Sequence, residues 1–199
     1  MILERKENRM KIYDISQEVF HCNVYPGDEL PSFERTLQME KNDIVNLTVF
    51  RMCAHNGTHV DAPYHFIKSG KTVDQLGLER MIGECTVIEH NGELMAEDVH
   101  RIMASAKPRV LLKGSTVVTL EAAKAFGKYQ VLLIGNESQT VGPEDGPMAV
   151  HLELLSKEVV LLEGIVLTEV EEGDYWLYAA PINLGGADGA PCRAVLIAQ

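Results

Sequence analysis

Short apolar runs alternate with amphipathic stretches along most of the 199-residue chain. A short run that is rich in β-branched residues and bounded by turn-forming residues is typical of a strand. Such runs predict strands over residues 11–15, 43–52, 85–90, 110–113, 131–134, 159–162, 175–179 and 194–198. Pro26 and Gly27 favour a turn between the first two, because proline presets φ and glycine tolerates positive φ.

Three amphipathic stretches between these runs predict helices over residues 96–106, 120–126 and 148–157. Thr119 is a suitable N-cap for the second helix, and Gly127 favours its end. Because strands and helices are interleaved, we expect an α/β fold with a mixed central sheet, and a mixed α+β arrangement is the alternative.

The composition is that of a folded globular protein, with 46% hydrophobic and 24% charged residues. At roughly 150 residues per domain the length corresponds to one domain, and no repeat or linker divides the sequence. Residues 1–9 are charged and offer little apolar surface to bury. We therefore expect a flexible leader over residues 1–9 and a single domain over residues 10–199.

The net charge of −11 argues against a nucleic-acid or anionic-membrane partner, because phosphate binding depends on Lys and Arg contacts. No stretch approaches the roughly 18 apolar residues of a membrane span, and the first ten residues lack the apolar core of a signal peptide. The four cysteines are widely spaced and form no C-x-x-C pair, which predicts free thiols. These features favour a cytoplasmic protein.

The densest chemical signal is the segment His55–Phe66, which reads HNGTHVDAPYHF. It contains three histidines and one aspartate, His55, His59, Asp61 and His65, all at odd-numbered positions. In an extended segment alternate side chains share one face, so these four could converge. Imidazole and carboxylate groups are suitable ligands for zinc, manganese or iron. The alternatives are incidental surface histidines or a hydrogen-bonded His–Asp pair.

Two residues of the C-terminal half are candidates for additional metal ligands. His151 lies on the third predicted helix, and Glu163 directly follows the apolar run at residues 159–162. A carboxylate at the end of a buried strand is costly unless it is paired or bound to a metal. A salt bridge is the structural alternative for Glu163, and Glu153 is a weaker candidate ligand.

The pattern His-x-Gly-Thr-His-x-Asp-Ala-Pro-x-His-Phe resembles the signature of the cyclase-like metal-dependent hydrolases, a family that includes the bacterial kynurenine formamidases and, more distantly, isatin hydrolase. Matching segments run from Lys11 to Ala198 and include Glu163-Gly164 and the run GADGAP at residues 186–191. The resemblance implies a single domain of the swivelling β/β/α type that forms dimers or tetramers.

The resemblance also implies the roles of the six candidate residues. His55, His59, Asp61, His151 and Glu163 would bind two divalent metals per chain, usually zinc with Mn²⁺ as an alternative, and Asp61 would bridge them. His65 would be the catalytic acid/base, because an imidazole can donate a proton to a leaving amine near neutral pH. The alternatives for His65 are a further metal ligand or a residue that orients one.

The implied reaction is hydrolysis of a non-peptide C–N bond in a small molecule, with an aryl formamide such as N-formylkynurenine as the leading substrate. Another small cyclic amide or ester is the first alternative, and a non-catalytic metal-dependent ligand-binding module is the second. Two positions depart from the formamidases: Thr140 stands where they tend to carry aspartate, and Tyr25 where they often carry tryptophan. The metal chemistry is therefore expected to transfer better than the substrate.

Overall fold

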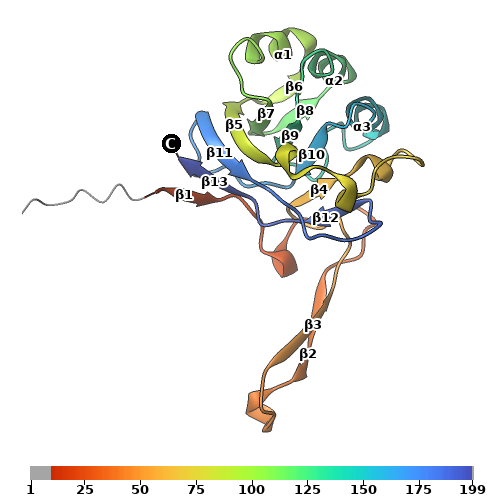
Figure 1. The fold of residues 1–199 in the computed structure, drawn as a ribbon, viewed down its shortest axis with the longest axis vertical. Coiled ribbons are helices and arrows are strands. Elements are labelled where there is room, and N and C mark those ends of the chain that lie inside the picture. Colours follow the sequence, from red (N-terminus) through yellow and green to blue (C-terminus); the bar gives the residue numbers. More distant parts are fainter. Residues whose placement is uncertain (1–9, 199) are drawn as a thin grey trace, which may run out of the picture.

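Nine strands form one sheet, and three α-helices cover one of its faces, in the computed structural model of the protein over residues 10–198 (Figure 1). The predicted leader, residues 1–9, lies outside the described residues. No helix within residues 10–198 is long and apolar enough to cross a membrane.

The central strands of the sheet are parallel and the outer strands are antiparallel. In spatial order the strands are β1 (Ile12–Asp14), β13 (Val195–Ala198), β11 (Gly173–Tyr178), β5 (Ile82–Glu89), β7 (Arg109–Lys113), β9 (Leu133–Asn136), β10 (Val160–Glu163), β4 (His59–Asp61) and β12 (Gly189–Pro191). Strands β5, β7, β9 and β10 pair in parallel, and every other pairing in this sheet is antiparallel. The predicted α/β class with a mixed sheet is confirmed.

Apolar side chains fill both faces of the central strands. Val110 and Leu112 of β7 belong to the core under the helices, whereas Leu111 between them belongs to the core on the opposite face. In β10, Leu161 lies on the helix side and Leu162 on the other. A strand buried on both faces needs an unbroken apolar run, which is why the sequence predicted these strands well.

The helices are α1 (Ala96–Ile102), α2 (Leu120–Phe126) and α3 (Met148–Leu155). The limits of α2 are those predicted, and the Thr119 hydroxyl accepts a hydrogen bond from the Ala122 N–H as an N-cap. Helix α3 ends two residues earlier than predicted, because Glu158 adopts a positive φ of 56° and turns the chain into β10. Helix α1 ends four residues early, in a turn.

A hairpin of β2 (Ser32–Leu37) and β3 (Leu47–Arg51) projects away from the main sheet (Figure 1). The sequence predicted one strand over residues 43–52 and missed β2, because every residue of β2 is exposed and its sequence marks no buried face. A short parallel pair, β6 (Gly92–Leu94) and β8 (Thr116–Val118), was also not predicted. The 3-10 helices are η1 (Val19–His21), η2 (Met39–Lys41), η3 (Pro63–His65), η4 (Val73–Gln75) and η5 (Leu78–Arg80).

Candidate metal centre and active site

The histidine-rich segment does not run as one extended strand. Only His59 and Asp61 lie on a strand, β4, whereas His55 lies in the preceding turn and His65 ends η3. Gly57 adopts a positive φ of 64°, which bends the chain before β4. Pro63 then begins η3, because its fixed φ suits the first turn of a helix. The four side chains nevertheless converge, through this bent path.

Strand pairing brings the distant candidates to β4. Glu163 of β10 lies directly opposite His59, and Gly189 of β12 lies directly opposite Asp61. His151 lies on α3, which packs on the helix-covered face of the sheet, and its ring contacts Asp61 and Glu163. All six residues singled out from the sequence therefore lie in one place, on segments up to about a hundred residues apart in the chain.

Asp61 lies among three imidazoles. Its Oδ1 is 2.8 Å from His55 Nδ1 and 3.4 Å from His59 Nε2, and its Oδ2 is 3.5 Å from His151 Nε2. Glu163 is 3.5 Å from His59 Nε2 and 3.2 Å from His151 Nε2. Two groups of potential metal ligands share Asp61: His55–His59–Asp61 and Asp61–His151–Glu163, each with ligand atoms within 4.8 Å of one another.

Backbone carbonyls orient two of these imidazoles toward the carboxylates. His59 Nδ1 is 2.9 Å from the Gly57 carbonyl oxygen, and His151 Nδ1 is 2.9 Å from that of Pro147. An N–H donated to a carbonyl at Nδ1 leaves the Nε2 lone pair facing inward, as is usual for a metal-ligating histidine.

Two inward-facing atoms lack a partner. Neither His59 Nε2 nor Asp61 Oδ2 has a hydrogen-bond partner among residues 10–198, and each side chain is only 1% exposed. A buried polar atom without a partner is costly. A divalent cation would satisfy both atoms, and the nitrogen and oxygen donors are those that zinc and manganese accept. The residues present therefore fit a metal centre.

The charges of the cluster point the same way. Burial alone would lower the pKa of His55, His59 and His151, but close contacts with the neighbouring carboxylates raise each pKa to about 10. For Asp61, burial raises the pKa, but the close contacts with the imidazoles of His151, His55 and His59 outweigh it and hold the pKa well below 3.8. Without a metal, the three imidazoles stay protonated near neutral pH and balance the charge of the buried carboxylates. A divalent cation would supply that positive charge in their place.

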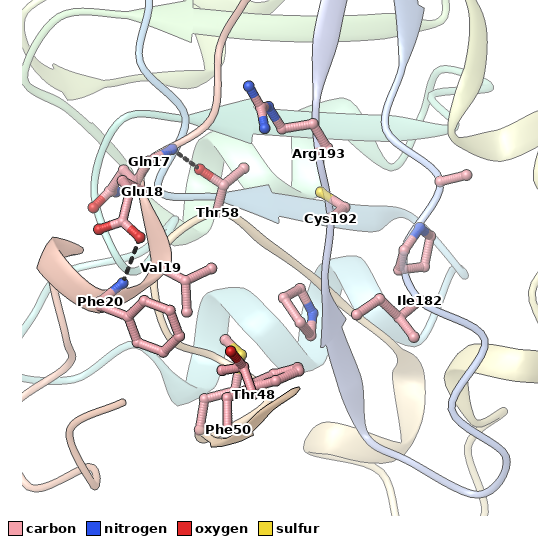
Figure 2. Close-up of a pocket in the computed structure, with 14 residues that line it drawn as sticks. Gln17, Glu18, Val19, Phe20, Thr48, Phe50, Thr58, Ile182, Cys192 and Arg193 are labelled. Atoms are coloured by element: carbon pink, nitrogen blue, oxygen red, sulfur yellow. Dashed lines mark hydrogen bonds between the residues drawn. The ribbon is translucent and has the colours of Figure 1, made fainter. Parts of the chain in front are cut away.

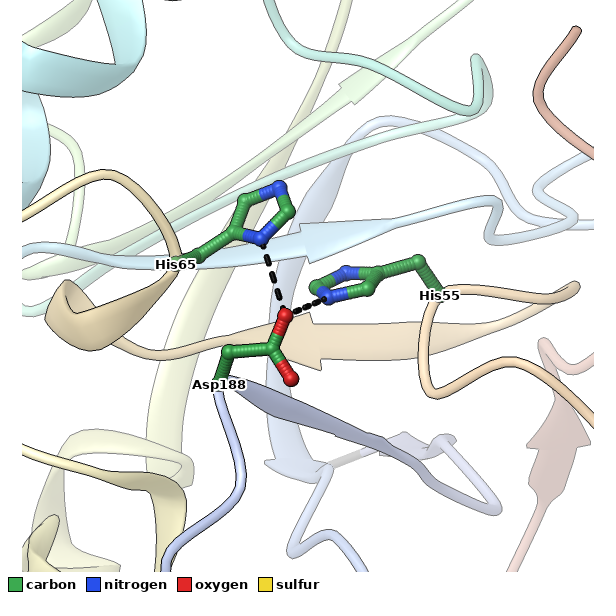
Figure 3. A group of neighbouring side chains, drawn as sticks. All are labelled: His55, His65 and Asp188. Atoms are coloured by element: carbon green, nitrogen blue, oxygen red, sulfur yellow. Dashed lines mark hydrogen bonds and ion pairs between the residues drawn. The ribbon is translucent and has the colours of Figure 1, made fainter. Parts of the chain in front are cut away.

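Asp188 is a functional candidate that the sequence did not single out. Its Oδ2 is 2.9 Å from His55 Nε2 and 3.1 Å from His65 Nδ1 (Figure 3). Hydrogen bonds from His55 and then from His65 hold the pKa of Asp188 below its ordinary value. The run at residues 186–191 was recognised as family-like, but no local pattern of residues indicated that this aspartate meets two histidines.

A cavity of about 400 Å³ opens beside the cluster. Its walls include both positions that depart from the formamidases, Tyr25 and Thr140, and the Thr140 hydroxyl has no hydrogen-bond partner within the described part of the chain. Asp28, not predicted from the sequence, also lines the cavity and lies 3.5 Å from the thiol of Cys53. Thr140 itself offers no carboxylate, but Asp28, Glu163 and Asp188 all line the cavity, and of these Asp28 is the one outside the histidine cluster.

Known proteins resemble this chain over nearly its whole length. It is 31% identical to a kynurenine formamidase from Erythrobacter litoralis, covering 96% of this chain and 95% of that protein. It is 33% identical to a kynurenine formamidase from Salinibacter ruber, covering 94% and 97%. The solved structure of a predicted metal-dependent hydrolase from Bacillus stearothermophilus superposes with a TM-score of 0.82 at 26% identity, covering 96% of this chain and 99% of the other.

The family model described as "Putative cyclase" matches residues 13–141, a span that contains His55, His59, Asp61 and His65. These similarities agree with the clustered side chains, and the hydrolase relatives favour the expected enzyme over the alternative of a non-catalytic binding module. The protein therefore belongs to this cyclase family and is a hydrolase.

Proposed function

We propose that the protein is a metal-dependent hydrolase of aryl formamides, with substrates of the N-formylkynurenine type. The observation that carries the proposal is the position of Asp61, which belongs to two of the three groups of potential metal ligands within the described residues. The relatives named kynurenine formamidase support the substrate class. His55, His59, Asp61, His151 and Glu163 would hold two divalent ions per chain, zinc being the proposed metal and manganese the alternative.

The ions, when bound, would polarise the formyl carbonyl and make a water molecule nucleophilic at neutral pH. The chain's own residues complete the reaction. His65 donates from Nδ1 to Asp188, so its Nε2, on the far side of the ring, is the atom available to protonate the leaving aryl amine. The centroid of the Phe66 ring lies 4.7 Å from that of His151 and 4.5 Å from that of His65. Phe66 therefore forms an apolar wall beside the two imidazoles.

Hydrolysis of formanilide by protein reconstituted with zinc tests this proposal. Removal of the imidazole in His65→Ala should lower kcat by roughly 10²–10⁴-fold, the usual contribution of a positioned general acid, with metal content unchanged. His100→Ala is the matched control, because His100 lies on α1 and its ring contacts Tyr129. It should leave both kcat and metal content at the parent values.

Three outcomes would count against parts of this assignment. Loss of metal in His65→Ala would make His65 a ligand rather than the proton donor. Hydrolysis of a cyclic amide or ester without hydrolysis of any aryl formamide would replace the substrate class. Equal kcat in His65→Ala and the parent would remove His65 from the chemistry.

We also propose that the protein is a homo-oligomer whose copies meet through the β2–β3 hairpin. Every residue of both strands is exposed, and a two-stranded hairpin alone is marginally stable in water. Its exposed apolar side chains include Phe33, Ile44 and Val49, and Ile44 is 93% exposed. Exposed apolar side chains gathered on one projecting element are typical of a protein interface.

A second copy of the chain is the partner that the charges favour. Residues 32–51 carry three acidic and three basic side chains, whereas the whole chain carries −11. Two copies with this net charge repel each other electrostatically, but the hairpin has no net charge and adds nothing to the repulsion. Beside its base lies an apolar groove of about 640 Å³, with Val19, Phe20 and Phe50 on one side and Ile182 on the other (Figure 2).

Sedimentation equilibrium tests the interface. Val49→Asp should convert the oligomer to monomers, because it places a charge in the covered apolar face. Leu78→Asp is the control, since Leu78 is 58% exposed on η5, outside both the hairpin and the groove. A monomeric parent, or equal masses for the parent and Val49→Asp, would overturn this proposal.

The proposed location is the cytoplasm. All four cysteines lie within the described residues and are free thiols, as predicted, and free thiols persist in a reducing compartment. Fractionation of cells that express the protein would test this, and recovery in a secreted fraction would contradict it.

A further inference from the structure

One carboxylate oxygen meets two histidines to which different roles are assigned. Asp188 Oδ2 lies 2.9 Å from His55 Nε2 and 3.1 Å from His65 Nδ1 (Figure 3). The two rings lie nearly face to face, with centroids 4.0 Å apart and planes inclined by 31°. A shift of this carboxylate would therefore affect both rings at once.

For His55, the contact determines which ring nitrogen can bind a metal. Nδ1 is 2.8 Å from Asp61, the carboxylate shared by the two ligand groups, and Nε2 is the atom that faces Asp188. An N–H donated from Nε2 to Asp188 leaves the Nδ1 lone pair directed toward Asp61 and the centre. A carboxylate partner on the outer nitrogen of a metal-binding histidine is known to fix both tautomer and ring orientation.

For His65, the same oxygen contacts the other ring nitrogen, Nδ1, and not Nε2 as in His55. Donation from Nδ1 to Asp188 leaves Nε2 pointing away from the carboxylate (Figure 3). His65 also lines the cavity beside the cluster. Without the contact, the ring could rotate about its side-chain bonds, because His65 is partly exposed at 28%. The orientation that proton transfer requires would then be occupied only part of the time.

The backbone holds Asp188 in place for this double contact. Its carbonyl oxygen accepts a 2.9 Å hydrogen bond from the N–H of Ala62, which lies between Asp61 and η3. The next residue, Gly189, pairs with Asp61 across β4 and β12. The backbone at Asp188 is therefore held against β4, the strand that carries His59 and Asp61.

We propose that Asp188 is a positioning residue that orients His55 toward the metal centre and His65 toward the substrate with a single carboxylate oxygen. This inference rests on the roles proposed above for the two histidines. It assigns Asp188 no direct contact with metal or substrate. Its removal should therefore weaken metal binding through His55 and slow turnover through His65, and the two effects should be separable.

The experiment measures zinc affinity by competition with a chelator, and kcat for formanilide at saturating zinc, in four proteins. These are the parent, Asp188→Ala, His65→Ala and the double variant. Asp188→Ala should lower zinc affinity by about 10- to 100-fold, the usual effect of removing such a partner. The fall in zinc affinity should be the same whether Asp188→Ala is made in the parent or in His65→Ala. The fall in kcat should appear when Asp188→Ala is compared with the parent, and not when the double variant is compared with His65→Ala.

Two further variants separate positioning from a general loss of charge or fold. Asp188→Asn keeps an oxygen that can accept from both rings, so it should restore part of the zinc affinity and kcat lost in Asp188→Ala. Glu121→Gln removes one exposed carboxylate on α2 and should match the parent in both measurements. Thermal unfolding of each variant checks that it is folded.

The outcomes decide separate points. Unchanged zinc affinity in Asp188→Ala would overturn the proposal, and so would an equal loss of kcat in the presence and absence of His65. A parent that binds zinc but hydrolyses no aryl formamide would refute the proposed substrate instead. In that case the zinc-affinity arm would still decide whether Asp188 orients His55.

Discussion

Gly189 packs directly against the His55 ring, and its replacement by alanine tests how closely that ring is held. A Cβ atom at this position would lie 2.7 Å from His55 Cε1 and 2.7 Å from the Val60 carbonyl oxygen. Both distances are too short for a Cβ atom in contact with a carbon or an oxygen atom. Moving the His55 ring relieves the first contact, but the Val60 oxygen belongs to the backbone of β4, so the pairing of β4 with β12 must shift as well.

The cost follows from overpacking at a buried position. Forcing a methyl group into a filled space costs about 1–3 kcal/mol, and for a chain of this length that lowers Tm by roughly 2–12 °C. Displacing His55 should also weaken zinc binding, because a ligand imidazole that moves loses its alignment with the other ligands. Thermal unfolding of the metal-free protein and chelator competition measure the two effects.

Gly185→Ala is the matched control for this prediction. It lies four residues earlier and is exposed, and an added Cβ would meet no atom within 4 Å. It should unfold and bind zinc like the parent. Parent-like Tm and zinc affinity in Gly189→Ala would refute the reasoning, since they would mean that the His55 ring does not occupy the described position.

The other predictions concern pH, metal content and substrate. The pKa of His55, His59 and His151 is raised from 6.5 to about 10 in the metal-free fold, so their protonation stabilises it fully below pH 6.5. Thermal unfolding should show this stabilisation lost as pH rises toward 10, and a flat profile would contradict it. Asp61→Ala should empty both metal sites, and full metal content by elemental analysis would exclude the shared role. Because Thr140 offers no carboxylate for a substrate amine, formanilide should be hydrolysed at least as well as N-formylkynurenine. A preference for N-formylkynurenine that Asp28→Asn abolishes would instead assign amine binding to Asp28.

Local sequence signals were sufficient for the parallel strands at the centre of the sheet and for helix α2. Strand β7 and helix α2 were predicted because an apolar run and a Thr119 cap act within a few residues. Strand β2 was not predicted, since its six residues are all exposed and it is held extended by its pairing with β3. Strand β12 is three residues of Gly, Ala and Pro, and only its pairing with β4 makes it a strand.

The candidate site divides in the same way. His55, His59, Asp61 and His65 lie within eleven residues, so their density was visible, and Glu163 was visible as a charge at the end of an apolar run. Asp188 was not, because the pairing of β12 with β4 brings it to His65 from 123 residues away. The convergence of the four side chains was inferred from an extended segment, whereas the chain bends at Gly57 and begins η3 at Pro63.

The central claim is that hydrolysis depends on a metal centre built around Asp61. The most direct measurement is the initial rate of formanilide hydrolysis by chelator-treated protein during titration with zinc. We predict negligible hydrolysis without zinc, a rise with added zinc, and a plateau at two ions per chain, the number of ligand groups that share Asp61. Full activity after chelation, or none at saturating zinc with any aryl formamide, would contradict the account.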